Sequence, residues 1–384
     1  MSRKQRGKPL KIIVFWLISA VLGFILLESF SSLALFHVGH LRQNQSVTFS
    51  YSDGRLATWQ FGKKVASLLG PTDETGLAIS SSASPLFIYH ATLGYTIISG
   101  THEFTLSRTI SEEPLHRQFS ATIWKDGTRA TSYSPKCSSR KILIFGDSMV
   151  WGWGNNDQQT FPWLLQTKYP GYKISNYAMN GYGNIHAMIQ IQNLKHLITA
   201  DDILIIVYAD FYNIRNVAAP SRIRVFNTDR WRATYSEKAE HPYGFFDGGE
   251  LQVGRVGLRC EINNGYCNQD DPEPGYMREV TKAIIAKISG MTDARVVVAY
   301  TEGKEDDPVL SFLQDQDITV LDVRPRQNYL ESDDFAPLDF HPGPLTQYHY
   351  FATLSDFFER RGWIVGGPSD ELDVAGAENC APQE

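Results

Sequence analysis

The chain has 384 residues, of which 42% are hydrophobic and 20% charged, and its formal net charge is -6 at pH 7. This composition is that of a globular protein, and the mildly acidic balance excludes a strongly basic surface for nucleic acid. The four cysteines form no C-x-x-C pair, so neither a zinc site nor a redox site is indicated, and we expect no cofactor.

A basic tip followed by an apolar run makes up residues 1–37. Five cations and no acid lie in the first eleven residues, and residues 12–27 are then apolar and uncharged. A helix that crosses a bilayer needs about 20 apolar residues, a length that is reached if the helix continues past Glu28. The preceding cations place the amino terminus in the cytoplasm and the rest of the chain outside. A cleaved signal peptide, with its cleavage site near residues 31–34, is the alternative.

Residues 38–135 alternate short runs of β-branched and aromatic residues with turns. We expect a linker, with a short helix near residues 56–69, and then a small β-rich prelude with a hairpin turn at Asp126-Gly127. This prelude either packs on the main domain or forms a separate binding module. Its strands are expected at residues 86–90, 95–99, 104–108 and 121–124.

The main domain, residues 136–365, alternates buried apolar runs with amphipathic segments. This alternation predicts an α/β fold, a three-layer sandwich in which a mostly parallel, flavodoxin-like sheet has helices on both faces. A tail, residues 366–384, has the composition of a disordered segment. Strands are expected at 142–145, 172–176, 203–208, 295–300 and 318–323, and helices after Thr160 and at 185–197, 276–289, 308–313 and 348–360.

Residues 217–275 are too many for a connecting loop. We interpret them as an insertion that either covers the active end of the sheet, as a lid or a wall for substrate, or lies at the periphery. Cys260 and Cys267 are close enough in the sequence to close a small disulfide loop if the protein is exported.

A serine stands at the carboxyl end of the first predicted core strand, in Gly146-Asp147-Ser148. In open α/β sheets ligands bind beyond the carboxyl ends of the strands, so Ser148 is placed where chemistry can occur. A serine hydroxyl is a weak nucleophile without a neighbouring base. No G-x-S-x-G surrounds Ser148, which argues against the nucleophile elbow of α/β-hydrolases.

A candidate base comes far along the chain, in Asp339-Phe340-His341-Pro342. His341 would take the proton from Ser148 and return it to the leaving group, while Asp339 would hold the other ring nitrogen. Asp333 and Asp334 are substitutes for Asp339, and a serine–histidine dyad is also open. Two further histidines, His186 and His349, fall inside predicted helices and are expected to be structural.

The Gly-Asp-Ser turn, the glycines Gly152 and Gly154, and the later Asp-x-His resemble the SGNH (GDSL-type) hydrolase superfamily. The stretch is most similar to the membrane-anchored SGNH proteins of bacteria, and the resemblance covers roughly residues 132–363. It implies a serine ester hydrolase or acyltransferase that uses Ser148, His341 and Asp339. The family usually spaces the last two as Asp-x-x-His, so the shorter spacing here is a departure.

The resemblance also implies where the oxyanion of the reaction is bound. The backbone N–H groups of Ser148 and Gly181 match two of the family's donors, and a glycine lets the backbone approach a substrate closely. The third donor is an asparagine in a Gly-x-Asn-Asp loop after the strand at 203–208, and this chain lacks that motif. Asp210 and Asn213 are the nearest candidates, and Asn213 is chemically preferable because an ionised Asp cannot donate a hydrogen bond.

We therefore expect an exported serine esterase or O-acyltransferase in the bacterial inner membrane, with its domain on the periplasmic or extracellular side. By analogy with the family, the substrate is an ester, an acetyl group on an envelope or extracellular glycan or on a small molecule. The alternatives are a non-catalytic envelope protein that binds glycan or a partner protein, and a lipase or lysophospholipase at the membrane.

Overall fold

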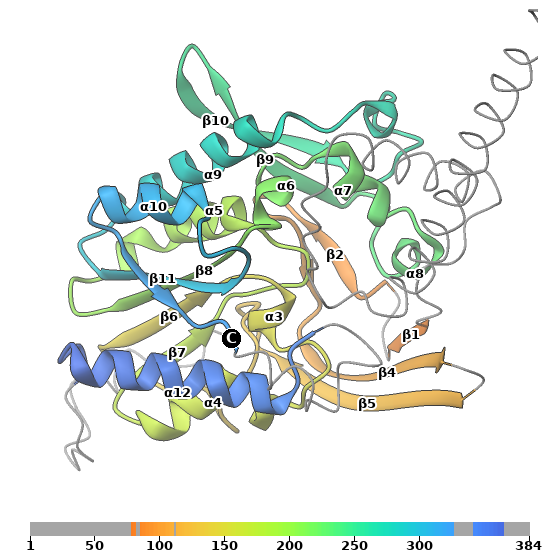
Figure 1. The fold of residues 1–384 in the computed structure, drawn as a ribbon. Helices are drawn as coiled ribbons and strands as arrows, with labels where there is room; N and C mark the ends of the chain where they lie inside the picture. Colours follow the sequence, from red (N-terminus) through yellow and green to blue (C-terminus); the bar gives the residue numbers. More distant parts are fainter. Residues whose placement is uncertain (1–77, 82–84, 111–112, 326–340, 365–384) are drawn as a thin grey trace, which may run out of the picture. The chain divides into compact units, whose positions relative to one another are not determined.

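The structure is a computed structural model that describes residues 78–81, 85–110, 113–325 and 341–364 (Figure 1). The predicted anchor, the short helix near residues 56–69 and the tail lie outside these residues, as do Asp339, Asp333 and Asp334. No helix within the described ranges is both long enough and apolar enough to cross a membrane.

Five parallel strands form the central sheet, in the order β12-β11-β8-β6-β7. The strands are β6 (Lys141–Phe145), β7 (Lys173–Asn176), β8 (Ile203–Ala209), β11 (Arg295–Glu302) and β12 (Thr319–Asp322). Numbered along the chain, this is the flavodoxin-like order 2-1-3-4-5, and the order reverses between β6 and β8. Every residue of β8 is buried, which explains its unbroken apolar sequence.

Helices cover both faces of this sheet (Figure 1). One face carries α4 (Phe161–Lys168) and α12 (Pro344–Arg360), which pack on each other. The other carries α5 (Asn184–Leu194), α9 (Pro274–Ser289) and α10 (Pro308–Asp315). On α9 the apolar positions Val280, Ile284 and Ile288 recur at helical spacing and are buried. The predicted three-layer α/β arrangement with a parallel sheet is confirmed.

The prelude is an antiparallel sheet and a hairpin that lie against the main domain. The strands are β1 (Ala78–Ser81), β2 (Phe87–His90), β3 (Gly94–Ile97), β4 (Gly100–Ile110) and β5 (Glu113–Ile123). Strands β4 and β5 are longer than the sequence predicts, because the apolar pattern is confined to the half of the ribbon in which Phe104 stacks on Phe119 next to Trp153. Just after β5, the Arg129 guanidinium donates to Asp157 and to three backbone carbonyls of the loop after the serine turn.

Residues 217–275 contain their own secondary structure. They include α7 (Pro220–Val225), α8 (Asp229–Arg232), the hairpin of β9 (Glu240–Asp247) and β10 (Glu250–Gly257), and the 3-10 turn η3 (Tyr266–Asn268). A disulfide joins Cys260 to Cys267, with 5.5 Å between their Cα atoms. The shorter elements elsewhere are α3 (Ser148–Trp151), η1 (Asp157–Gln159), η2 (Lys195–Leu197) and α6 (Tyr212–Asn216).

Candidate active site

Ser148 is the first residue of α3, three residues beyond the end of β6. It therefore lies at the point where the strand order reverses, the place where open α/β sheets bind ligands. The preceding Asp147 caps the helix, and its side chain accepts a hydrogen bond from the Met149 N–H at 3.0 Å. A Cβ on Gly146 would come within 2.6 Å of Val150, so only glycine fits this tight turn.

The hydroxyl of Ser148 lies 2.7 Å from Nε2 of His341, a hydrogen bond between residues 193 positions apart. His341 stands just before α12, in a loop that is held to the serine turn because Asn155 donates to the Pro342 carbonyl at 2.8 Å. Ser148 is only 6% exposed. The structure thus places the predicted nucleophile and the predicted base in contact, which is the arrangement needed for general-base activation of a serine.

An ion pair beneath the serine joins two segments of the site. Arg215, on α6, donates to Asp147 at 2.6 Å and to the Tyr182 carbonyl at 3.1 Å. Its guanidinium also lies over the Phe211 ring, 4.4 Å from the centroid. Because Asp147 precedes the serine and Tyr182 follows Gly181, Arg215 ties the serine turn to the turn that carries Gly181.

Gly181 has a φ of +83°, in the left-handed region that favours glycine. A Cβ there would come within 2.7 Å of both the Tyr95 hydroxyl and an Arg222 nitrogen. Among the described residues, no hydrogen-bond acceptor takes the N–H of Gly181. The N–H of Ser148, in the first turn of α3, has no acceptor within that helix. Both backbone groups are therefore available to a ligand at the serine.

Asp210 and Asn213 do not line the cavity at Ser148. The side-chain amide of Asn213 donates to the Asp210 carbonyl at 2.7 Å and lies 3.3 Å from the Tyr208 hydroxyl. Asp210 is exposed as a residue, but its carboxyl group is partly shielded from solvent, and this desolvation raises its pKa. The loop after β8 turns directly into α6, so the Asn213 amide bonds to the Asp210 backbone and to Tyr208 on β8 and does not line the cavity at the serine.

The cavity beside Ser148 and His341 has a volume of about 100 Å³. Asn180 borders it next to Gly181, and its buried side-chain oxygen has no hydrogen-bond partner among the residues that the structure describes. The sequence reasoning missed Asn180, although its position directly before the expected oxyanion glycine was a usable signal. Apart from Arg215 on α6, residues of the insertion form the rest of the wall: Arg222, Val225, Phe226, Trp231 and Tyr235. The insertion is therefore a wall of the site and not a peripheral excursion.

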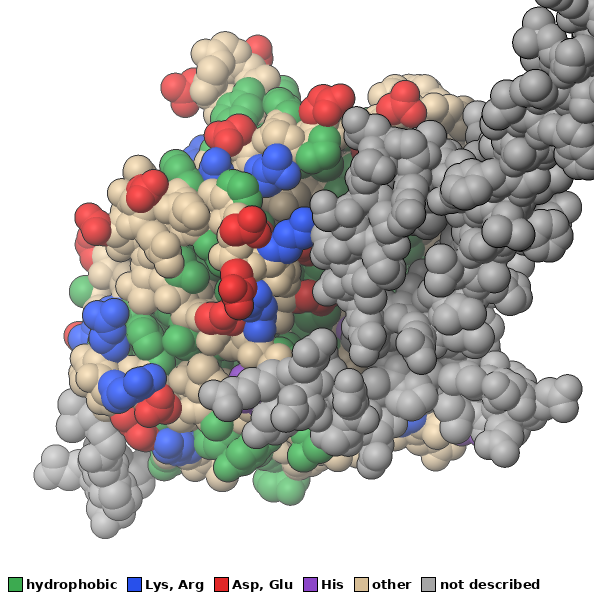
Figure 2. All heavy atoms as spheres, in the orientation of Figure 1, with side chains coloured by type: hydrophobic (Ala, Val, Ile, Leu, Met, Phe, Trp, Pro, Cys, Tyr) green, Lys and Arg blue, Asp and Glu red, His purple; other side chains and the backbone are tan. Residues whose placement is uncertain are grey.

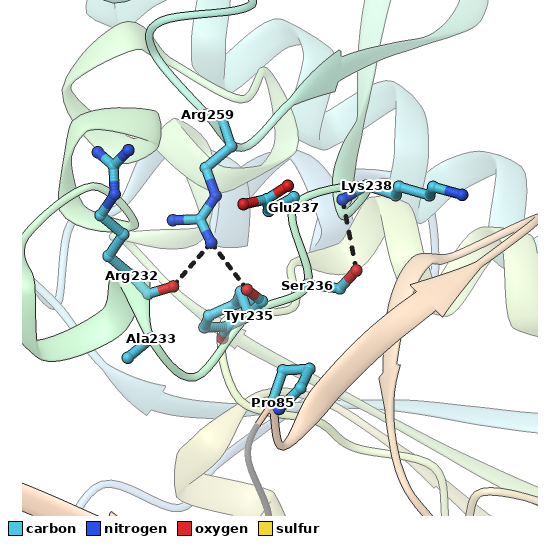
Figure 3. Close-up of a pocket in the computed structure, with 8 residues that line it drawn as sticks. All are labelled: Pro85, Arg232, Ala233, Tyr235, Ser236, Glu237, Lys238 and Arg259. Atoms are coloured by element: carbon cyan, nitrogen blue, oxygen red, sulfur yellow. Dashed lines mark hydrogen bonds between the residues drawn. The ribbon is translucent and has the colours of Figure 1, made fainter.

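A second, larger cleft of about 710 Å³ shares Tyr235 with this cavity. Figure 3 shows Arg259 reaching across it, where the guanidinium donates to the backbone carbonyls of Arg232 and Tyr235 at 2.7 and 2.9 Å. The residues that line this cleft include no serine–histidine pair. The chemistry is therefore assigned to the smaller cavity.

Two buried histidines form hydrogen bonds with the backbone next to the site. His186 accepts the Gly183 N–H at its Nδ1, and His241 donates from Nε2 to the Arg215 carbonyl at 2.9 Å. Burial, and next the facing charged groups, lower the pKa of His241 to about 3 and that of His186 well below its ordinary value. Both rings are neutral at pH 7 and serve the fold, as predicted for His186. Within the described residues no cluster of His, Cys, Asp or Glu side chains is placed to hold a metal ion.

Comparison with known proteins gives distant similarities only. No family model and no curated protein matches the chain. Solved structures that match include a member of the lipolytic G-D-S-L family from Veillonella parvula (13% identity, 58% of this chain and 99% of that chain, TM-score 0.33). Others are a psychrotrophic esterase from Pseudoalteromonas (11%, 58% and 97%, TM-score 0.33) and a catalytic mutant of an acetylxylan esterase from Geobacillus stearothermophilus (13%, 61% and 100%, TM-score 0.31). Because these similarities are distant, the interpretation of the site rests on its own motifs and geometry.

Proposed function

We propose that this chain is a serine ester hydrolase of the SGNH (GDSL-type) superfamily. The observation that carries the proposal is the 2.7 Å contact between Ser148 Oγ and His341 Nε2 at the switch point of the sheet. The Gly-Asp-Ser turn and the chain order of serine, glycine and histidine support the same family. Asp339, outside the described residues, is the proposed partner of the other imidazole nitrogen.

The reaction follows from this geometry. His341 Nε2 accepts the hydroxyl proton while Ser148 Oγ attacks the ester carbonyl, which gives a tetrahedral intermediate with a negative oxygen. The protonated imidazole then donates to the departing alkoxide, and an acyl-enzyme remains on Ser148. A water molecule that gives its proton to the same imidazole then attacks the acyl group and forms a second tetrahedral intermediate. Breakdown of this intermediate releases the acid, and the imidazole returns the proton to Ser148 Oγ. Attack by a sugar hydroxyl instead of water would make the same site an O-acyltransferase.

Three donors are proposed for the oxyanion: the N–H groups of Ser148 and Gly181 and the side-chain amide of Asn180. Asn180 takes the place of the asparagine that the family supplies after β8. It borders the cavity, whereas the Asn213 amide is committed to the Asp210 carbonyl and faces the Tyr208 hydroxyl. A preorganised donor of this kind typically contributes about 100- to 1000-fold in rate.

The substrate that we propose is a short acyl ester, an acetyl group on an envelope or extracellular glycan. A cavity of about 100 Å³ suits an acetyl group better than the fatty-acyl chain of a lipid, which disfavours the lipase alternative. The Cys260–Cys267 disulfide supports an oxidising compartment and hence export. We also propose that residues 1–37 anchor the protein in the bacterial inner membrane, with the domain on the periplasmic side.

The test is hydrolysis of p-nitrophenyl acetate together with labelling by a fluorophosphonate probe. We expect Ser148→Ala to abolish both, and His341→Ala to lower turnover by at least 1000-fold. Ser311→Ala, on α10 and remote from the cavity, is the matched control and should retain full turnover. Equal turnover in the wild type and in both site variants would contradict the proposal, and absence of probe labelling in folded protein would favour a non-catalytic binding protein.

A further inference from the structure

Arg222 presents a guanidinium without a carboxylate partner to the cavity of the proposed active site. It comes from α7 in the insertion and lines the cavity with Ser148 and His341. Within the described ranges its buried Nε has no hydrogen-bond partner, and its Nη2 donates to the Gly181 carbonyl at a long 3.5 Å. Across the described part of the chain, no carboxylate forms an ion pair with it.

The neighbouring arginine provides an internal comparison. Arg215 lines the same cavity, but its charge is matched by Asp147 at 2.6 Å. Among the described residues Arg222 has no such carboxylate: its guanidinium lies over the Phe226 ring, 4.5 Å from the centroid, and makes the long hydrogen bond to the Gly181 carbonyl. Asp147, Arg215 and Arg222 together carry one net positive charge beside the serine. Glu302 offsets it only in part, because burial and next the charge of Asp210 raise the pKa of its carboxyl group to about 7.

This positive charge is local to the cavity. The whole chain carries a net charge of -6, and in Figure 2 acidic and basic side chains are interspersed over the coloured part of the face shown. An excess of positive charge beside Ser148 therefore does not reflect a generally basic protein. It results from the placement of one side chain of the insertion.

Holding a partly buried guanidinium without a partner is unfavourable for the free protein. Burial, and next the charge of Arg215, lower the pKa of the Arg222 guanidinium from its ordinary value to about 10. An anion in the cavity would stabilise the charged guanidinium of Arg222, because it would accept hydrogen bonds from the free N–H groups and offset the positive charge. Arginine is suited to this task, since its planar fork binds a carboxylate through two parallel hydrogen bonds.

The larger cleft beyond Tyr235 is also lined by basic side chains. Arg232, Lys238 and Arg259 line it together with one acid, Glu237, and Arg232 is also paired with Glu261. Arg259 is 7% exposed, and its Nη1 is buried without a hydrogen-bond partner. Two neighbouring cavities that share Tyr235 thus each contain an arginine nitrogen without a hydrogen-bond partner in the described part of the chain.

We propose that the site selects esters that carry a carboxylate close to the scissile carbonyl, with Arg222 as the group that binds this carboxylate. The inference rests on the proposed function, since it names the substrate class of the same serine site. On the alcohol side of the ester, the carboxylate would belong to an acidic sugar such as a uronic acid. On the acyl side, it would belong to a dicarboxylic half-ester.

Two pairs of substrates test the proposal and separate these sources. The first pair is an acetylated methyl glucuronide and the methyl glucoside acetylated at the same hydroxyl. The second pair is mono-4-nitrophenyl succinate and 4-nitrophenyl butyrate. For each pair the measured quantity is the ratio of kcat/KM for the anionic member to that for the neutral member.

We expect Arg222→Leu to lower this ratio by roughly 10- to 100-fold in one of the two pairs, the typical worth of hydrogen bonds to a charged group. Arg222→Lys keeps the charge but loses the fork, so it should show a smaller decrease. Arg224→Leu is the matched control, since Arg224 is exposed on the same helix and binds the Cys267 carbonyl away from the cavity. Its ratio should equal that of the wild type.

An unchanged ratio in both pairs for Arg222→Leu would overturn the inference, because a general loss of rate indicates an oxyanion or a structural role instead. If the wild type hydrolyses no ester, the proposed function fails, and binding still tests the inference. Calorimetry on Ser148→Ala should then show at least 10-fold tighter binding of the anionic member in at least one of two pairs: methyl glucuronide against methyl glucoside, or monomethyl succinate against methyl butyrate. Adding Arg222→Leu should remove that preference, and equal binding within both pairs to Ser148→Ala would refute the inference.

Discussion

Replacement of Asn180 by alanine tests the least conventional part of the proposed mechanism. The side-chain amide of Asn180 borders the cavity, whereas its backbone carbonyl accepts the Tyr95 hydroxyl at 3.0 Å. The substitution removes the amide and leaves that backbone contact in place. Its side-chain oxygen has no hydrogen-bond partner in the structure, so the change orphans no buried donor elsewhere.

The expected loss is large and lies mainly in kcat. An oxyanion donor acts on charge that develops in the transition state, so its removal lowers kcat by about 100- to 1000-fold, or roughly 3 to 4 kcal/mol, with little change in KM. Asn180→Asp has nearly the same shape but places an ionised acceptor beside the oxyanion. It should therefore be at least as inactive as Asn180→Ala.

The assay is steady-state hydrolysis of p-nitrophenyl acetate, with melting temperature as a check on folding. Asn213→Ala is the matched control, because Asn213 is the residue that the sequence favours and the structure directs elsewhere. We expect the control to retain kcat within about threefold. The reasoning is refuted if Asn213→Ala loses 100-fold or more while Asn180→Ala is close to wild type.

Two further predictions concern stability. Arg215→Met leaves the buried Asp147 carboxylate without its partner, so it should destabilise the fold by about 3 to 5 kcal/mol in urea unfolding, and a change below 1 kcal/mol would be inconsistent with this ion pair. Below about pH 6.5 the unfolded chain binds a proton at His241, whereas the folded protein, in which this pKa is about 3, does not. Stability therefore decreases as the pH is lowered, and His241 alone should lower the free energy of unfolding by about 3 kcal/mol at pH 4.5. His241→Gln keeps a donor for the Arg215 carbonyl and should lose that much less stability between pH 7 and 4.5, so an identical loss in both proteins would contradict the assignment.

Much of the main domain could be read from local patterns. An unbroken apolar run predicts β8, because a strand that is buried on both faces needs no polar residues. Apolar residues at helical spacing predict α9, because only one face of that helix is buried. The long hairpin of β4 and β5 was underestimated, since its length depends on cross-strand pairing that the sequence pattern does not display. The elements inside residues 217–275 were likewise missed as elements, although the length of the segment indicated an insertion.

The residues of the proposed active site also differ in whether local sequence patterns predict them. Ser148, Gly181 and His341 were predictable because each stands in a short motif whose spacing is set by local geometry: a strand end, a left-handed turn and a loop before a helix. Asn180 was predictable only through its place directly before Gly181, and Arg222 was not predictable. Whether a guanidinium of the insertion faces the cavity depends on where that distant segment folds back, and no local pattern records that position. Motif spacing along the chain thus predicted the proposed nucleophile and its proposed base, whereas only the tertiary structure shows which side chains of the insertion border the same cavity, because that depends on how the insertion packs.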